Sequence, residues 1–97
     1  MKPIAFHPEA KAEQADAAHW YEQRVPGLGA AFREEAEAAV SRIAATPEAF
    51  GIVSDDIRCH RLHRFPFGMI YRIEADRILI LAVMHLHRDP TYWEHRA

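Results

Sequence analysis

The sequence predicts an α+β fold, in which a helical hairpin packs on one side of a small, curved and mainly antiparallel sheet. Residues 8–45 are rich in alanine and place apolar side chains at helical spacing. From Ile57 onward, side chains alternate with the period of two that is typical of strands. A short apolar segment, residues 2–7, is predicted to be a first strand. The expected order is β-α-α-β-β-β, within one domain over residues 1–97.

Two helices are expected before the main part of the sheet. The first is predicted to begin at Pro8, because proline suits the first helical position. It continues over residues 10–24, with Trp20 and Tyr21 as bulky anchors, and ends before the proline–glycine pair that follows. Residues 29–45 are predicted to form the second helix, whose buried face consists of Phe32, Ala36, Ala39, Val40 and Ile43. Its solvent-exposed face is expected to hold Glu34, Glu35 and Glu37.

Strand character begins at Ile57, after a predicted loop at residues 51–56. The alternation places one set of side chains on one face of this strand, Arg58, His60, Leu62 and Arg64, and another set on the opposite face, Cys59, Arg61 and His63. A proline and a glycine at positions 66 and 68 mark a bend before the next strand, residues 69–73.

The remaining elements follow from the same patterns. Residues 74–77 are predicted to be a hairpin connection. Residues 78–84 are apolar at every position, so we expect an internal strand that is covered on both faces. Residues 92–96 are expected to form one terminal helical turn.

Composition limits the cellular setting. Cys59 is the only cysteine, so no internal disulfide is possible, which fits a reducing compartment. Residues 1–8 lack the apolar segment of a signal peptide. The longest apolar run, residues 78–84, is much shorter than the roughly 20 residues that a membrane span requires. We therefore expect a cytoplasmic protein that does not associate with membranes.

Charge is distributed unevenly along the chain. Residues 1–56 hold five Lys or Arg and ten Asp or Glu, whereas residues 57–97 hold seven Arg, no Lys, four Asp or Glu and five of the seven histidines. Arginine makes bidentate contacts with phosphate and carboxylate groups. The second half is therefore expected to bind an anionic group or a protein partner.

Two segments carry a resemblance to known proteins. They are Arg64-Phe65-Pro66-Phe67-Gly68-Met69-Ile70-Tyr71 and Ala82-Val83-Met84-His85-Leu86-His87-Arg88-Asp89-Pro90. Together with the element order, they resemble the RelE/ParE superfamily of toxins from type II toxin–antitoxin modules, and in particular a ParE-like branch often described as plasmid-stabilisation proteins. The resemblance implies a cognate antitoxin that wraps the toxin and holds it inactive. Operator DNA would be contacted only through that antitoxin.

The resemblance leaves the activity open. ParE-like members inhibit DNA gyrase and are not nucleases, whereas RelE-like members cut messenger RNA on the ribosome. The chain is thus an enzyme only under the second alternative. In both cases the candidate functional face comprises Arg61, Arg64, Tyr71, His85, His87 and Arg88. In a nuclease, histidine would act as the acid or base and arginine would stabilise the phosphate.

Two departures favour the gyrase alternative. RelE-like nucleases have a catalytic cation just before the apolar-apolar-Tyr sequence of the middle strand, where this chain has Phe67 and Gly68. They are also strongly basic, whereas the net charge of this chain is −2, which offers little neutralisation of RNA phosphates.

Three further interpretations remain. The chain could be a degenerate toxin that only binds its antitoxin and regulates the operon. His85 and Tyr71 could be half-buried sheet residues, with the arginines solvated or bound to the antitoxin. A zinc site could form from His60, His63, His85, His87 and Cys59, although the nearby arginines would repel a cation. We expect no metal and no cofactor.

Overall fold

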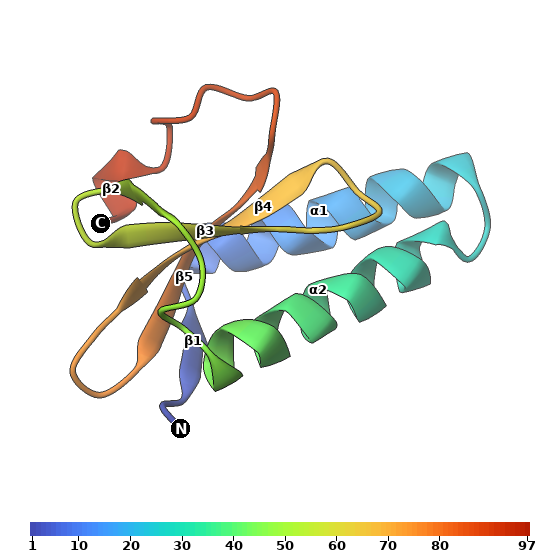
Figure 1. Cartoon of the computed structure of the whole chain (residues 1–97). Coiled ribbons are helices and arrows are strands. Elements are labelled where there is room, and N and C mark those ends of the chain that lie inside the picture. The colour runs from blue at the N-terminus through green and yellow to red at the C-terminus, as the bar shows by residue number, and fades with distance from the viewer.

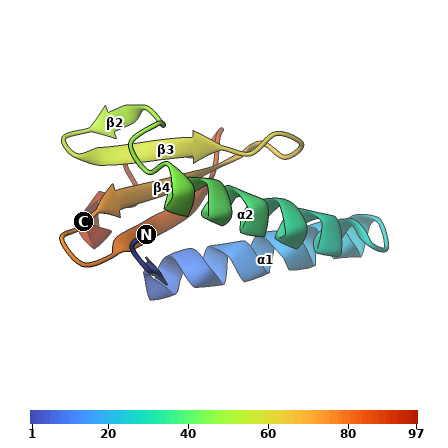
Figure 2. The same cartoon turned by 60° about the horizontal axis from the view of Figure 1, so that its bottom comes forward.

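The computed structural model describes all residues, Met1–Ala97. It contains a three-residue strand, two long helices, four further strands and a short 3₁₀ helix, in the order β1 (Ile4–Phe6), α1 (Pro8–Arg24), α2 (Leu28–Ala45), β2 (Ile52–Ser54), β3 (Ile57–Arg61), β4 (Phe67–Ile73), β5 (Ile78–His85) and η1 (Glu94–Arg96). Both helices lie on one side of the sheet, and the C-terminal segment lies on the other (Figures 1 and 2). The predicted α+β architecture is confirmed.

The five strands form one sheet in the order β1-β5-β4-β3-β2. β1 runs parallel to β5, with Ile4 opposite Ile78, and all other neighbours are antiparallel. β5 lies between β1 and β4, and every residue from Ile78 to Met84 is buried. The prediction of an internal strand covered on both faces is therefore confirmed.

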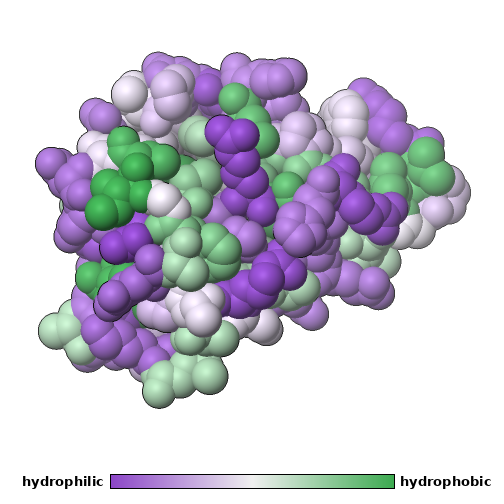
Figure 3. Space-filling model, in the orientation of Figure 1, coloured by the Kyte–Doolittle hydropathy of each residue, from purple (hydrophilic) through white to green (hydrophobic).

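The edge strand β2 was not predicted. Residues 51–56 were expected to be a loop, but Ile52–Ser54 pairs with β3 through a tight turn in which Asp55 has a φ of 49°. Aspartate tolerates this left-handed conformation better than most residues. Because no strand lies beyond β2, the side chains of Ile52 and Val53 are mostly exposed. They contribute to the hydrophobic surface at that end of the sheet (Figure 3).

The strand after this turn is shorter than the sequence predicts. β3 ends at Arg61, because the backbone N–H groups of His63 and Arg64 donate to the Glu35 carboxylate of α2 and not to another strand. Glu35 thus satisfies two backbone donors that would otherwise lack a partner. The expectation that Glu35 belongs to a purely solvated helix face was wrong, while Glu34 and Glu37 are exposed.

The connection between the helices brings them into close contact. Gly27 has a φ of 89°, a conformation that side chains disfavour. The Glu22 carboxylate accepts hydrogen bonds from the backbone N–H groups of Gly27 and Gly29, and so caps the start of α2. A Cβ atom at Gly29 would lie 2.6 Å from the Ala18 carbonyl oxygen of α1. Glycine therefore allows the helix crossing that holds the hairpin against the sheet.

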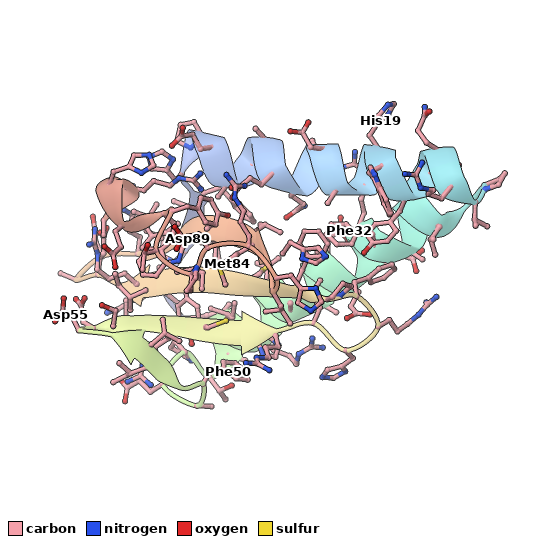
Figure 4. All side chains as sticks on the ribbon, turned by 90° about the horizontal axis from the view of Figure 1, so that it is seen from above. His19, Phe32, Phe50, Asp55, Met84 and Asp89 are labelled. Atoms are coloured by element: carbon pink, nitrogen blue, oxygen red, sulfur yellow. The ribbon has the colours of Figure 1, made fainter.

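The sheet separates two apolar clusters. Between helices and sheet, the rings of Tyr21, Phe32, Phe65 and Phe67 pack with centroid distances of 4.8 to 6.2 Å. Figure 4 shows Phe32 on the inner side of the helices, whereas His19 projects away from them. On the other face, Trp93 of the C-terminal segment covers residues of β4 and β5. Neither helix is both long and apolar enough to cross a membrane.

Candidate functional surfaces

The six predicted site residues do not form one cluster. His85 ends β5, and His87 and Arg88 follow it in a turn. Arg61 lies at the end of β3 and lines a cavity of about 400 Å³ on the outer face of the sheet. Arg64 lies in the loop before β4, and Tyr71 lies in the core. The structure thus brings His85, His87 and Arg88 together and separates them from Arg61 and Tyr71.

Tyr71 is a structural residue in this fold. Its side chain is fully buried, and its hydroxyl donates a hydrogen bond of 2.5 Å to the Pro47 carbonyl oxygen. Burial raises the pKa of Tyr71 to about 12, so the phenol keeps its proton at neutral pH. The bond ties β4 to the segment that follows α2. A buried and hydrogen-bonded phenol has no surface with which to contact a partner.

Arg61 and Arg64 are both exposed, and neither forms an ion pair. The Arg64 guanidinium lies 5.5 Å from the centroid of the Phe65 ring. Near Arg61, the cavity on the outer face also includes Cys59. Burial raises the pKa of the Cys59 thiol, so it remains protonated. These two arginines therefore present free donor groups to solvent.

A groove of about 500 Å³ runs between α1 and the ends of β4 and β5 that lie near His85. We refer to it as the α1–β5 groove. Its lining includes apolar and aromatic side chains from both layers, Ala17, Trp20, Tyr21, Phe67 and Val83. Trp20 was predicted to anchor α1, but its side chain is 51% exposed at this groove. The Arg24 guanidinium lies 4.1 Å from its ring. The groove is therefore a concave aromatic surface that is open to solvent.

Charged residues line the same groove. Glu13 and Asp16 come from α1, and His85 and Arg88 come from the end of β5 and the turn that follows. The ring of His85 lies 5.1 Å from that of Phe67, and its Nδ1 accepts the backbone N–H of His87 at 3.1 Å. This hydrogen bond orders the start of the turn, and the acidic and basic groups come from opposite layers.

Glu13 connects α1 to β5 and to the C-terminal segment. Its Oε1 accepts a hydrogen bond of 3.0 Å from the Val83 backbone N–H. Val83 lies beyond residues 78–80, the part of β5 that pairs with β1. Its Oε2 accepts the Tyr92 hydroxyl at 2.7 Å, and both oxygens accept from Arg96 at 3.0 and 3.1 Å. Arg96 also pairs with Glu9 at 3.0 Å and donates to a carbonyl oxygen of β5. One carboxylate thus fastens the C-terminal segment to the first helix.

Arg88 is held next to this network. Its guanidinium carbon lies 3.6 Å from the centroid of the Tyr92 ring, and its Nη1 lies 3.6 Å from Glu13 Oε2. Burial, followed by the hydrogen bond to Glu13, raises the pKa of Tyr92, so its hydroxyl remains a donor.

Asp89 orders the turn that contains Arg88, because its carboxylate accepts hydrogen bonds from the backbone N–H and the hydroxyl of Thr91 at 2.9 and 2.8 Å. These bonds also lower the pKa of Asp89. Figure 4 shows the loop with Asp89 above the strand that carries Met84.

The contact of Glu13 with Tyr92 and Arg96 was not predicted from the sequence. Glu9 and Glu13 lie four residues apart, hence on one face of α1. That spacing could have marked a pair of carboxylates with a shared partner. Nothing in the spacing identifies the partner, because Arg96 follows Glu13 by 83 residues.

The residues at the start of β4 are closely packed. The Phe67 ring belongs to the aromatic cluster between helices and sheet. On the other face, a Cβ atom at Gly68 would lie 2.7 Å from Cys59 Sγ and 3.4 Å from Leu86 Cδ2. A cationic side chain at position 67 would replace this ring packing, and one at position 68 would collide with its neighbours.

His60 forms a buried contact with α2. Its Nε2 accepts a hydrogen bond of 3.0 Å from Arg42 Nε, and its ring stacks on Phe50 with a centroid distance of 3.9 Å. Burial, followed by the charges of Arg42 and His63, lowers the pKa of His60. We find no group of three or more His, Cys, Asp or Glu side chains that could hold a metal ion.

Comparisons with known proteins agree with this fold. Residues 4–90 match the family described as the ParE toxin of the type II toxin–antitoxin system, parDE. A solved structure described as the chromosomal ParDE TA system from P. aeruginosa aligns with a TM-score of 0.64 and 17% identity, over 90% of this chain and 98% of that chain. No curated protein sequence matches.

The fold is that of RelE/ParE toxins, as the sequence predicted. Within that class, the chain belongs to the ParE toxin family of type II toxin–antitoxin systems. The resemblance on which the functional expectations rested is therefore confirmed.

Proposed function

We propose that this ParE-family toxin arrests growth by inhibiting DNA gyrase, and that a cognate antitoxin neutralises it. The observation that most favours gyrase over messenger RNA is the packing at the start of β4. Phe67 packs in the aromatic cluster, and a Cβ atom at position 68 would lie 2.7 Å from Cys59 Sγ, so a side chain there would require Cys59 to move. The cation that a RelE-like nuclease places just before the middle-strand tyrosine therefore has no counterpart here.

The separation of the other candidate residues supports the same choice. Cleavage at a ribose 2′-hydroxyl requires a base, a phosphate-binding cation and an acid around one phosphate. Here Arg61 and Arg88 line different depressions. Tyr71 is buried, and its hydroxyl donates a hydrogen bond to the Pro47 carbonyl oxygen. A toxin that acts by binding a protein does not need these groups to converge.

For the target, we propose that Arg61 and Arg64 contribute to the gyrase-binding surface. Both guanidinium groups are exposed and unpaired, and arginine is enriched among residues that dominate protein–protein binding. His87 is also exposed, in the turn after β5, and would lie at the margin of such a surface. The proposal places the protein in the cytoplasm, where gyrase acts, with operator DNA contacted only through the antitoxin.

The test is inducible expression without the antitoxin, combined with a supercoiling assay using purified gyrase. We expect growth arrest, DNA breaks linked to gyrase, and weaker inhibition by Arg61→Ala and Arg64→Ala at unchanged melting temperature. Arg77→Ala is a matched control, because Arg77 lies in the β4–β5 turn and pairs with Glu74. Rapid ribosome-dependent cleavage of messenger RNA would instead establish the RelE-like alternative. Normal growth with folded toxin would indicate a chain that only binds its antitoxin.

A further inference from the structure

Arg88 is fixed in place but keeps hydrogen-bonding capacity. Arg96 occupies both oxygens of Glu13 and also pairs with Glu9. The distance from Arg88 Nη1 to Glu13 is 3.6 Å, which is too long for a hydrogen bond. The guanidinium is thus positioned by stacking on Tyr92 and by attraction to Glu13, while 54% of its side chain is exposed. Its donor groups remain available for an anion.

The surroundings of Arg88 favour a carboxylate from a protein over a phosphate from nucleic acid. Glu13 and Asp16 line the same groove, and they would repel a chain of phosphates. Binding to nucleic acid also needs several cations along a backbone track, whereas Arg88 is the only arginine in the groove lining. The aromatic floor beside it suits a bulky apolar side chain.

We propose that the α1–β5 groove and Arg88 together bind one segment of the cognate antitoxin. That segment places a large apolar side chain against Tyr21, Phe67 and Val83, and an Asp or Glu carboxylate against Arg88. Asp16 on α1 adds a second constraint, since a Lys or Arg of the partner is complementary there and an acid is not. The groove therefore selects both the composition and the direction of the segment. This inference rests on the proposed existence of a neutralising antitoxin.

In this arrangement Tyr92 is a positioning residue for Arg88. The Arg88 guanidinium stacks on the Tyr92 ring, and the hydrogen bond from the Tyr92 hydroxyl to Glu13 fixes the orientation of that ring. Tyr92→Phe keeps the stacking surface and removes only the hydroxyl, whereas Tyr92→Leu removes the aromatic face. The two variants therefore separate the positioning of Arg88 from general packing of the C-terminal segment.

The experiment measures the dissociation constant between the toxin and its cognate antitoxin, alongside gyrase inhibition and melting temperature. We expect Arg88→Ala to weaken antitoxin binding roughly 10- to 100-fold, and Arg88→Glu to weaken it more, at little cost in stability. Tyr92→Leu should weaken binding more than Tyr92→Phe. Arg77→Ala, which changes an arginine of similar exposure, should bind as the unmodified toxin does.

Charge exchange identifies the partner group. Each Asp and Glu of the antitoxin is changed in turn to Arg, and one of these variants should restore binding to the Arg88→Glu toxin. Unchanged antitoxin binding by Arg88→Glu would overturn the inference. So would a loss of gyrase inhibition with normal antitoxin binding, because the groove would then serve the target. A toxin that binds antitoxin through Arg88 but leaves gyrase active would refute the proposed target and leave this inference standing.

Discussion

Replacement of Glu13 by alanine should destabilise the protein strongly, because this carboxylate accepts hydrogen bonds from three residues in two segments, β5 and the C-terminal segment. Removing it leaves the Val83 N–H without its acceptor, and an unsatisfied buried donor costs about 1–3 kcal/mol. Arg96, whose side chain is only 5% exposed, loses its bidentate partner and keeps Glu9 and a carbonyl oxygen. Breaking a buried ion pair completely costs about 3–5 kcal/mol, so this partial loss lies below that range.

The expected total is a loss of about 3 kcal/mol in the free energy of unfolding. For a domain of this size that corresponds to a fall in melting temperature of roughly 12–24 °C. Urea denaturation followed by circular dichroism gives the free energy directly. The free energy of unfolding of Glu13→Gln should lie between those of the unmodified protein and Glu13→Ala. Its amide oxygen can still accept from Val83, whereas the charge opposite Arg96 is lost.

Asp16→Ala provides the control, since Asp16 is exposed one turn from Glu13 and makes no hydrogen bond to another segment. It should change the free energy by less than about 0.5 kcal/mol. A loss of less than about 1 kcal/mol in Glu13→Ala would refute the reasoning, because the unsatisfied donor alone should cost that much. In that case the C-terminal segment would be held mainly by its apolar contacts.

Three further outcomes follow from single contacts. Because burial lowers the pKa of His60 in the folded state, the unfolded chain protonates first as the pH falls. The free energy of unfolding should therefore be full above about pH 6.5 and decline below it. His60→Gln, which can still accept from Arg42, should show a shallower decline when denaturation is measured between pH 5 and 8. An equal slope in both proteins would contradict this assignment. Gly68→Arg, which supplies the cation of a nuclease, should lower stability by about 1–3 kcal/mol through collision with Cys59 and should not create ribonuclease activity. Gly68→Ala adds only the Cβ atom that would lie 2.7 Å from Cys59 Sγ, so it measures this collision without the added charge. RNA cleavage by the arginine variant would count against the packing argument. Tyr71→Phe should lower the free energy of unfolding by about 1 kcal/mol through loss of one buried hydrogen bond. Its toxicity should fall only in proportion to the folded fraction. A non-toxic variant of unchanged stability would show that Tyr71 takes part in function.

Much of the fold could be predicted because it depends on local periodicity. The helices follow from alanine-rich spacing, and the burial of β5 follows from an unbroken apolar run. β2 could not be predicted in this way, because a three-residue edge strand with exposed Ile52 and Val53 has almost no pattern of its own. The early end of β3 depends on Glu35, which lies on a helix and reaches a loop 28 residues later.

The predicted site residues were chosen by chemistry and by position along the strands, and neither property determines which side chains meet. Arg61 ends β3 and Arg88 lies in the turn after β5, and both are exposed, yet they line different depressions. Tyr71 lies between exposed candidates in the sequence, but the inner face of β4 buries it. Glu13, which orients Arg88, lies 75 residues earlier in the chain.

By itself, the sequence determined the α+β class, the helical hairpin, the buried strand and the family, because these depend on spacing between near neighbours and on short residue patterns. Only the tertiary structure decided which cations are free and which are paired. The reason is physical: ion pairs and grooves form between segments that are distant in the chain, and their partners depend on how the helices and the C-terminal segment fold around the sheet. For this protein that packing leaves Arg88 beside an aromatic groove and commits Arg96 to Glu13.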